Sequence, residues 1–95
     1  MSERLQAAAE ALRVKMEGSG FQGSVKFDMA DEGCIRVEDE RVSTGDGPAD
    51  CTISAAIETF QEMFQGDLDP TAAFMTGKIR IDGDMGAAMR LAQLL

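Results

Sequence analysis

The carboxylates near the end of the sequence are the residues best placed to do chemistry. Asp67 and Asp69 fall in one expected turn, and Asp82 and Asp84 fall in another. Such pairs could act as general acid and base or could bind a metal ion. The sequence has no histidine to relay a proton, and the carboxylate spacing does not match a calcium-binding loop. We therefore predict no catalytic residues, no metal site and no cofactor, and we expect that the chain is not an enzyme.

A glycine-containing stretch, GKIRIDGDMG at residues 77–86, could in principle hold a phosphate. Its glycines do not complete the G-x-G-x-x-G pattern, and no G-x-x-x-x-G-K-[ST] loop is present in the sequence. Asp84 would place a negative charge where the phosphate should bind. We interpret this stretch as a tight turn followed by a helix cap.

The two cysteines, Cys34 and Cys51, offer no further reactive site. Two cysteines are too few for a disulfide framework, and no histidine is available to complete a zinc site with them. We expect both to be reduced side chains that behave as small buried hydrophobic groups.

Length and charge limit what the chain can bind. Its 95 residues suffice for one hydrophobic core, so we expect residues 1–95 to form a single domain. The net charge of −8 argues against nucleic-acid binding and against adhesion to anionic membranes, since both need basic surfaces. The sequence shows no signal-peptide pattern and no long apolar run, so we expect a cytoplasmic protein without stable membrane insertion.

Apolar periodicity predicts the elements that position these residues. We expect helices at 2–17, from 56 to a stop at Gly66, at 70–76 and at 85–95, and strands at 23–30, 34–38, 41–44, 50–55 and 78–82. Ser2, Asp69 and Asp84 are the predicted helix caps, and Pro70 suits a first helical position. Short turns between consecutive strands predict an α+β fold, in which helices cover one face of a five-stranded, largely antiparallel sheet.

Methionine is unusually frequent in this sequence. There are seven methionines, and four of them lie in the C-terminal half: Met63, Met75, Met85 and Met89. Methionine is flexible and polarizable, so it suits exchangeable apolar partners, although it also serves as filler in a small core. The residue types alone leave both interpretations open.

Several stretches resemble the sterol carrier protein family, also called the non-specific lipid-transfer domain. The resemblance covers essentially the whole chain and is most specific at Asp50–Ile53, Leu68–Pro70, Phe74–Met75, Gly77–Ile81, Gly83–Asp84 and Met89. It implies a five-stranded sheet covered by helices that enclose an apolar tunnel. Members of the family bind fatty acids, fatty acyl-CoA esters, phospholipids or sterols without catalysing a reaction on them. Because this chain is acidic and lacks a peroxisomal tail, a small bacterial stand-alone member fits best.

The resemblance and the apolar stripes together give a set of residues expected to line the tunnel and to contact a long-chain lipid or fatty acyl ligand. These residues are Phe60, Met63, Phe64, Leu68, Phe74, Met75, Ile79, Ile81, Met85, Met89 and Leu94. The alternative is a regulatory subunit whose apolar groove docks a partner helix or a second copy of the chain. A small acidic hydrolase is disfavoured by the missing histidine.

Overall fold

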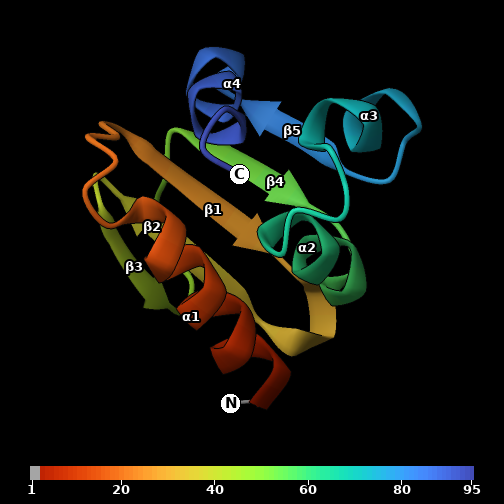
Figure 1. Cartoon of the computed structure of the whole chain (residues 1–95), viewed down its shortest axis with the longest axis horizontal. Helices are drawn as coiled ribbons and strands as arrows, with labels where there is room; N and C mark the ends of the chain where they lie inside the picture. The colour runs from red at the N-terminus through yellow and green to blue at the C-terminus, as the bar shows by residue number, and fades with distance from the viewer. Residues whose placement is uncertain (1–2) are drawn as a thin grey trace.

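Figure 1 shows the computed structural model of the chain, which describes residues 3–95. The predicted cap Ser2 lies outside the described residues. The helices are α1 (Glu3–Met16), α2 (Ile57–Phe64), α3 (Pro70–Met75) and α4 (Met85–Ala92), with a short 3-10 turn, η1 (Ala30–Glu32); the strands are β1 (Ser24–Asp28), β2 (Cys34–Glu38), β3 (Arg41–Thr44), β4 (Cys51–Ser54) and β5 (Arg80–Gly83). The predicted helices and strands are present and differ from these only at their ends.

The strand order in the sheet is β3-β2-β1-β4-β5. β4 pairs with β1 in parallel, whereas the other pairings are antiparallel, so the sheet is mixed and our prediction of a largely antiparallel meander is wrong. The burial pattern agrees with this order. β3 and β5 are exposed or half-buried along their length, which suits the two edges of the sheet, whereas Cys51 and Ile53 of β4 are buried, which suits an inner strand.

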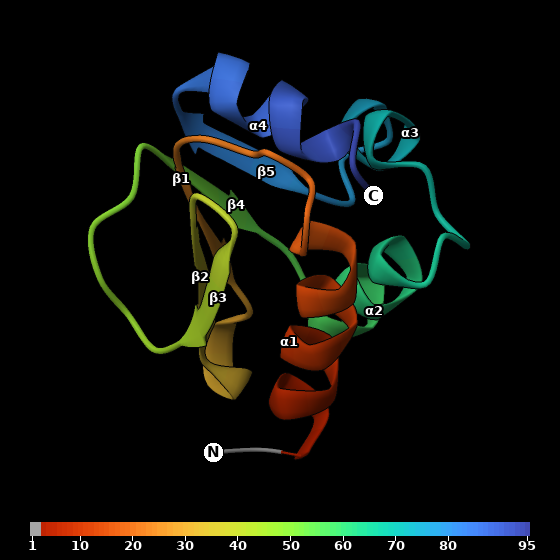
Figure 2. The ribbon, with the colours of Figure 1, turned by 60° about the vertical axis from the view of Figure 1, so that its left-hand side comes forward.

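The loop at residues 45–50 carries the chain back across the sheet from the edge strand β3 to β4. It lies on the face away from the helices (Figure 2), and two basic side chains of the sheet hold it there. Lys26 Nζ donates to Asp46 Oδ1 at 2.9 Å, and Arg36 Nε donates to the carbonyl oxygen of Pro48 at 3.0 Å. The hydrogen bond between Lys26 and Asp46 raises the pKa of the lysine and lowers the pKa of the aspartate. Lys26 and Arg36 are cross-strand partners, so one pair of side chains fixes this crossover.

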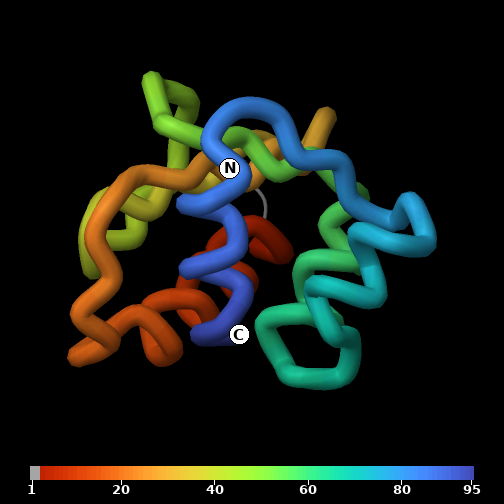
Figure 3. Tube along the Cα trace, turned by 90° about the horizontal axis from the view of Figure 1, so that it is seen from above, coloured from red at the N-terminus to blue at the C-terminus, as the bar shows by residue number. Residues whose placement is uncertain are grey.

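The helices cover the other face of the sheet (Figures 1 and 3). α1 contacts β2, β3 and α2, whereas α4 contacts β1, β4 and β5. Between α2 and the sheet, the ring of Phe27 meets the edges of Phe60 and Phe64 with centroids 5.2 and 5.3 Å apart. Phe60 and Phe64 stack at 5.9 Å, so an aromatic cluster fills the middle of the core.

Gly83 ends β5 at a point where only glycine fits. Its φ is +103°, and a Cβ there would lie 2.6 Å from the carbonyl oxygen of Asp50. We expect Gly83→Ala to lower the free energy of unfolding by about 2–5 kcal/mol, because the left-handed backbone costs ~1–2 kcal/mol and the clash costs ~1–3 kcal/mol. Urea unfolding followed by circular dichroism measures this.

Gly45→Ala is the matched control for this substitution. Gly45 also has a positive φ, +122°, but a Cβ there would have no atom within 4 Å. Only the backbone cost of about 1–2 kcal/mol should remain. Equal losses for the two variants would mean that the close approach of β5 to Asp50 contributes nothing.

Candidate functional site

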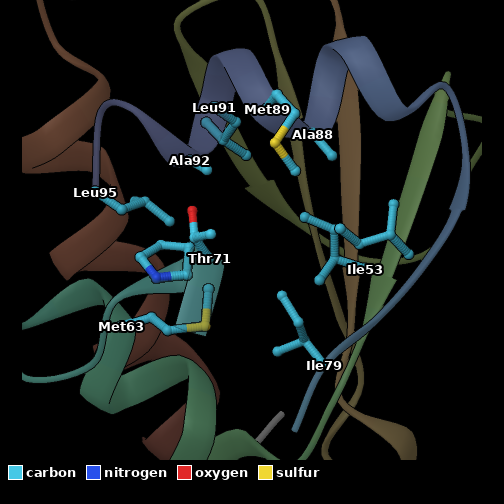
Figure 4. Close-up of a pocket in the computed structure, with 11 residues that line it drawn as sticks. Ile53, Met63, Thr71, Ile79, Ala88, Met89, Leu91, Ala92 and Leu95 are labelled. Atoms are coloured by element: carbon cyan, nitrogen blue, oxygen red, sulfur yellow. The ribbon is translucent and has the colours of Figure 1, made fainter. Parts of the chain in front are cut away.

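An apolar pocket lies between α4, α3 and the end of the sheet formed by β4 and β5 (Figure 4). In that view Met89 and Ala88 approach it from α4, Ile53 and Ile79 from the sheet side, and Met63 from α2. The lining residues are Ile53, Met63, Pro70, Thr71, Ile79, Ile81, Ala88, Met89, Leu91, Ala92 and Leu95. Among these, the only polar side chain is that of Thr71.

The pocket is nearly closed in this structure. Its volume is about 10 Å³, which is room for roughly one water molecule. Sites for small organic ligands typically enclose about 300–1,000 Å³. A long-chain ligand therefore needs the helices above the pocket to move apart or the lining side chains to change rotamer.

α4 is positioned by a capping aspartate and by small side chains. The Asp84 carboxylate accepts hydrogen bonds from the backbone N–H groups of Gly86, at 2.9 Å, and Ala87, at 3.3 Å, as predicted. Ala87 and Ala88 are fully buried, and their small size lets the helix lie close to the sheet. Above the pocket, α4 therefore presents the small side chains of Ala88 and Ala92 beside the larger Met89 and Leu91.

α3 is positioned by its own capping residue. Asp69 Oδ1 accepts from the backbone N–H of Thr71 at 3.1 Å, and Pro70 occupies the first helical position, so both predictions are confirmed. After the helix, the backbone N–H of Ile79 donates to the Ala73 carbonyl at 3.4 Å. This turn places Ile79, which is buried, at the floor of the pocket just before β5 begins.

The structure brings four of the eleven predicted tunnel residues to this pocket. They are Met63, Ile79, Ile81 and Met89. Phe60 and Phe64 lie instead in the aromatic cluster with Phe27. Leu68 and Leu94 are half-buried and pack against the core.

The remaining predicted residues lie at the surface. Phe74 and Met75 on α3 are 38% and 79% exposed, and Met85 on α4 is 42% exposed. Sequence reasoning missed Ile53, Pro70, Thr71, Ala88, Leu91, Ala92 and Leu95. Four of these, Ala88, Leu91, Ala92 and Leu95, follow the helical spacing i, i+3, i+4, i+7, which is the signal that could have identified them.

The reactive groups of the described residues are poorly suited to nucleophilic or metal chemistry. Burial raises the pKa of the Cys51 thiol, and the negative charges of Asp84 and Asp82 raise it further. Burial and Asp28 raise the pKa of Cys34. A thiol with a raised pKa is a weak nucleophile at neutral pH. Over residues 3–95 no group of three acidic or cysteine side chains could hold a metal ion, and no helix could span a membrane.

Comparison with known proteins relates this geometry to a family. The model of the SCP-2 sterol transfer family matches residues 1–95. The chain is 39% identical over 82 residues to "Hydroxysteroid dehydrogenase-like protein 2" of Danio rerio, a match that covers 78% of this chain but only 20% of that protein. This chain therefore spans about a fifth of the length of that curated relative.

Two solved structures from Aedes aegypti share the fold. The crystal structure of Sterol Carrier Protein 2 Like 2 has a TM-score of 0.80 at 17% identity and covers 97% of this chain and 96% of its own. The solution structure of palmitated SCP2L2 has a TM-score of 0.75 at 19% identity, with coverages of 99% and 94%. These relatives are animal proteins, so a bacterial stand-alone member stays a prediction.

Asp69 should be important for stability through its cap. We expect Asp69→Ala to lower the free energy of unfolding by about 1 kcal/mol, because the N–H of Thr71 loses its partner at the start of α3. Asp67→Ala is the control, since Asp67 is exposed and precedes the helix, and it should change stability by less than about 0.5 kcal/mol. Urea midpoints measure both, and an unchanged midpoint for Asp69→Ala would contradict the structural role.

Proposed function

Because the chain belongs to the SCP-2 sterol transfer family, we propose that it binds the apolar part of a lipid in the pocket beneath α4 and carries it without chemical change. The observation that supports this proposal is the lining itself. Its side chains are apolar except for Thr71, and they come from the sheet and from three helices. Such a site recognises a ligand by burial of hydrocarbon.

The energy available from hydrocarbon burial is large enough to open the pocket. Burying one methylene contributes ~0.8 kcal/mol, so a sixteen-carbon chain offers about 12 kcal/mol before costs. Association and ordering cost at least ~4 kcal/mol, which leaves at most about 8 kcal/mol before the cost of separating α4 from the sheet is subtracted. Micromolar affinity, about −8 kcal/mol, is therefore the tightest binding that we expect.

The ligand class that we propose is a fatty acid or fatty acyl ester. Met63 and Met89 have flexible, unbranched side chains that can move aside to different extents for chains of different lengths. A nearly closed pocket that widens by rotamer changes suits a flexible chain better than a rigid ring system. The related Aedes aegypti protein is described as palmitated, which supports the same class.

A second candidate function is favoured by the exposed apolar side chains of α3 and α4. Phe74, Met75, Met85 and Met89 are four of the five large hydrophobic side chains exposed among the described residues. This surface could dock a partner helix or a second copy of the chain. Native mass spectrometry of freshly purified protein separates the two functions, because a carrier retains acyl mass as a monomer whereas a docking subunit retains a protein partner.

We expect a fluorescent long-chain fatty acid to bind at one saturable site per chain with micromolar affinity. Unlabelled palmitate should displace it, because both would occupy the same pocket. Fluorescence titration measures the stoichiometry and the dissociation constant. No saturable binding up to high micromolar ligand would count against the carrier function and favour the docking subunit.

Met89→Phe tests whether α4 borders the binding space. Met89 lines the pocket and is 37% exposed, so a phenylalanine ring can be accommodated there without clashing with a packed core. We therefore expect the urea midpoint to be unchanged or slightly raised. Fatty-acid binding should weaken severalfold, because the ring would occupy space that the ligand needs. The matched control is Met85→Phe, on the same helix and 42% exposed but outside the lining, which should leave binding unchanged. A clearly lower urea midpoint for Met89→Phe with binding intact would identify the position as ordinary core.

A further inference from the structure

Within the described residues, β5 pairs only with β4 and forms an edge of the sheet (Figure 1). Along an antiparallel pair, residues whose N–H and C=O groups bond to the neighbouring strand alternate with residues whose groups point away from it. Asp84 follows β5 in the same register, and its N–H donates to the Asp50 carbonyl at 2.9 Å. By this alternation, the N–H and C=O groups of Ile81 and Gly83 point out of the sheet at its free edge.

A hydrogen bond on the other side of β4 gives the same alternation. The N–H of Ala55, directly after β4, donates to the Asp28 carbonyl of β1 at 3.2 Å. Ser54, the residue before it, therefore bonds to β5 through its backbone. Ser54 is the partner of Arg80, so the backbone groups of Arg80 point to β4 and those of Ile81 point outward.

The opposite edge of the sheet is covered, whereas the β5 edge is open. β3 packs against α1, and Arg13 of α1 donates through Nε to the Val42 carbonyl at 3.3 Å. Within residues 3–95, no comparable hydrogen bond reaches Ile81 or Gly83 from outside β4. An uncovered edge presents donors and acceptors that can bond to another strand. β5 is therefore the edge at which the sheet can be extended.

The side chains of β5 are complementary to those of a second copy in antiparallel orientation. Along the strand, Arg80 is positive, Ile81 is apolar and Asp82 is negative. When two copies pair about Ile81, Arg80 of each copy lies directly opposite Asp82 of the other. Ile81 lines the pocket, so the two charged side chains lie on the other face of the sheet, away from the helices. Both are exposed, and within the described residues neither forms an ion pair.

The backbone of β5 supports pairing about the same residue. This register places outward-pointing residues opposite each other, so the Ile81 residues of the two copies exchange two hydrogen bonds. Gly83 then lies opposite Ile79, and its N–H can donate to the Ile79 carbonyl of the other copy. Main-chain and side-chain groups therefore favour one and the same register.

Neighbouring registers fit less well. A shift by one residue would set outward-pointing groups opposite inward-pointing ones and would lose the hydrogen bonds. A shift by two residues would place Arg80 opposite Arg80 or Asp82 opposite Asp82. In the register about Ile81, exposed Lys78 also lies opposite Asp84, which adds a further match of opposite charges.

We propose that the chain forms a dimer in which the β5 strands of two copies pair antiparallel about Ile81 and join the two five-stranded sheets. The contact uses the same strand of both copies, so it closes on itself, and the covered β3 edges end the joined sheet. Arg80 and Asp82 lie outside the apolar pocket. The inference therefore goes beyond the proposed lipid-binding function and does not rest on it.

The association should be weak. β5 has four residues, so the pairing buries little area, as in transient interfaces. Exposed Phe74 and Met75 precede the strand and exposed Met85 follows it, so the antiparallel register would bring the end of α3 in one copy towards the start of α4 in the other. We expect a dissociation constant on the order of 100 μM, so the chain would be a monomer at low micromolar concentration.

Charge reversal on β5 tests the proposal. Sedimentation equilibrium of the full chain, from about 10 μM to about 1 mM, measures the dissociation constant of the dimer. Arg80→Glu and Asp82→Lys should each weaken self-association at least about tenfold, because like charges then face each other at both charge pairs. An equimolar mixture of the two variants should associate as tightly as the unmodified protein, because opposite charges face each other again. Arg41→Glu, exposed on the covered edge strand β3, is the control with the same charge change as Arg80→Glu and should have no effect.

Each other outcome contradicts the β5 dimer. An unmodified chain that stays a monomer across this range lacks the contact. Self-association that persists in both variants lies at another surface, and equal weakening by Arg41→Glu would show an effect of net charge alone. A mixture of the two variants that fails to associate excludes this register. Because Arg80 and Asp82 are exposed, both variants should keep the urea midpoint, and a clear loss would mean that these charges stabilise the single chain instead of a dimer.

Discussion

Three phenylalanine rings determine which part of the interior is fixed. Phe27, in the central strand β1, is fully buried and meets Phe60 and Phe64 in edge-to-face geometry, which joins α2 to the middle of the sheet. A close-packed aromatic cluster of this kind leaves no space and resists rearrangement. At the other end of the same sheet face, α4 packs through Ala87, Ala88 and Leu91, two of which are small. We therefore expect the interior to resist rearrangement more strongly under α2 than under α4.

The proposed function depends on this difference between the two ends of the core. A lipid needs a volume many times the 10 Å³ that the pocket has in this structure, so binding must separate elements that are now in contact. α4 buries three residues, Ala87, Ala88 and Leu91, whereas α1 buries five. Hydrophobic stabilisation follows the apolar area removed from water, so α4 costs less to displace than α1. The ligand then replaces the contacts that the helix gives up.

Local pattern was enough to predict the elements of this fold but not their arrangement in the sheet. The alternation of Val25 and Phe27 and the caps at Asp69 and Asp84 are properties of short segments. The parallel pairing of β4 with β1 depends on a loop that crosses the outer face and is held by Lys26 and Arg36, which are distant in sequence. The lengths of the turns between consecutive strands carry no information about these long-range contacts, so they cannot predict the parallel pairing.

The candidate site shows the same limit at the level of side chains. Periodicity identifies the buried face of a helix, but a filled core and a ligand pocket are both apolar. Helical spacing therefore groups Phe60 and Phe64 with Met63, although the rings fill the core and only the methionine reaches the pocket. Ala88 and Ala92 were missed because a small side chain carries little hydrophobic signal, yet small size is what leaves space beneath α4. Amide hydrogen exchange, measured with and without saturating palmitate, is the most direct test of whether α4 opens. In the unliganded protein we expect the amides of α4 to exchange much faster than those of α1 and β1, and we expect the exchange rates of α4 to change when palmitate binds. Amides of α4 that exchange as slowly as those of β1, at rates that palmitate does not change, would contradict the opening of this helix.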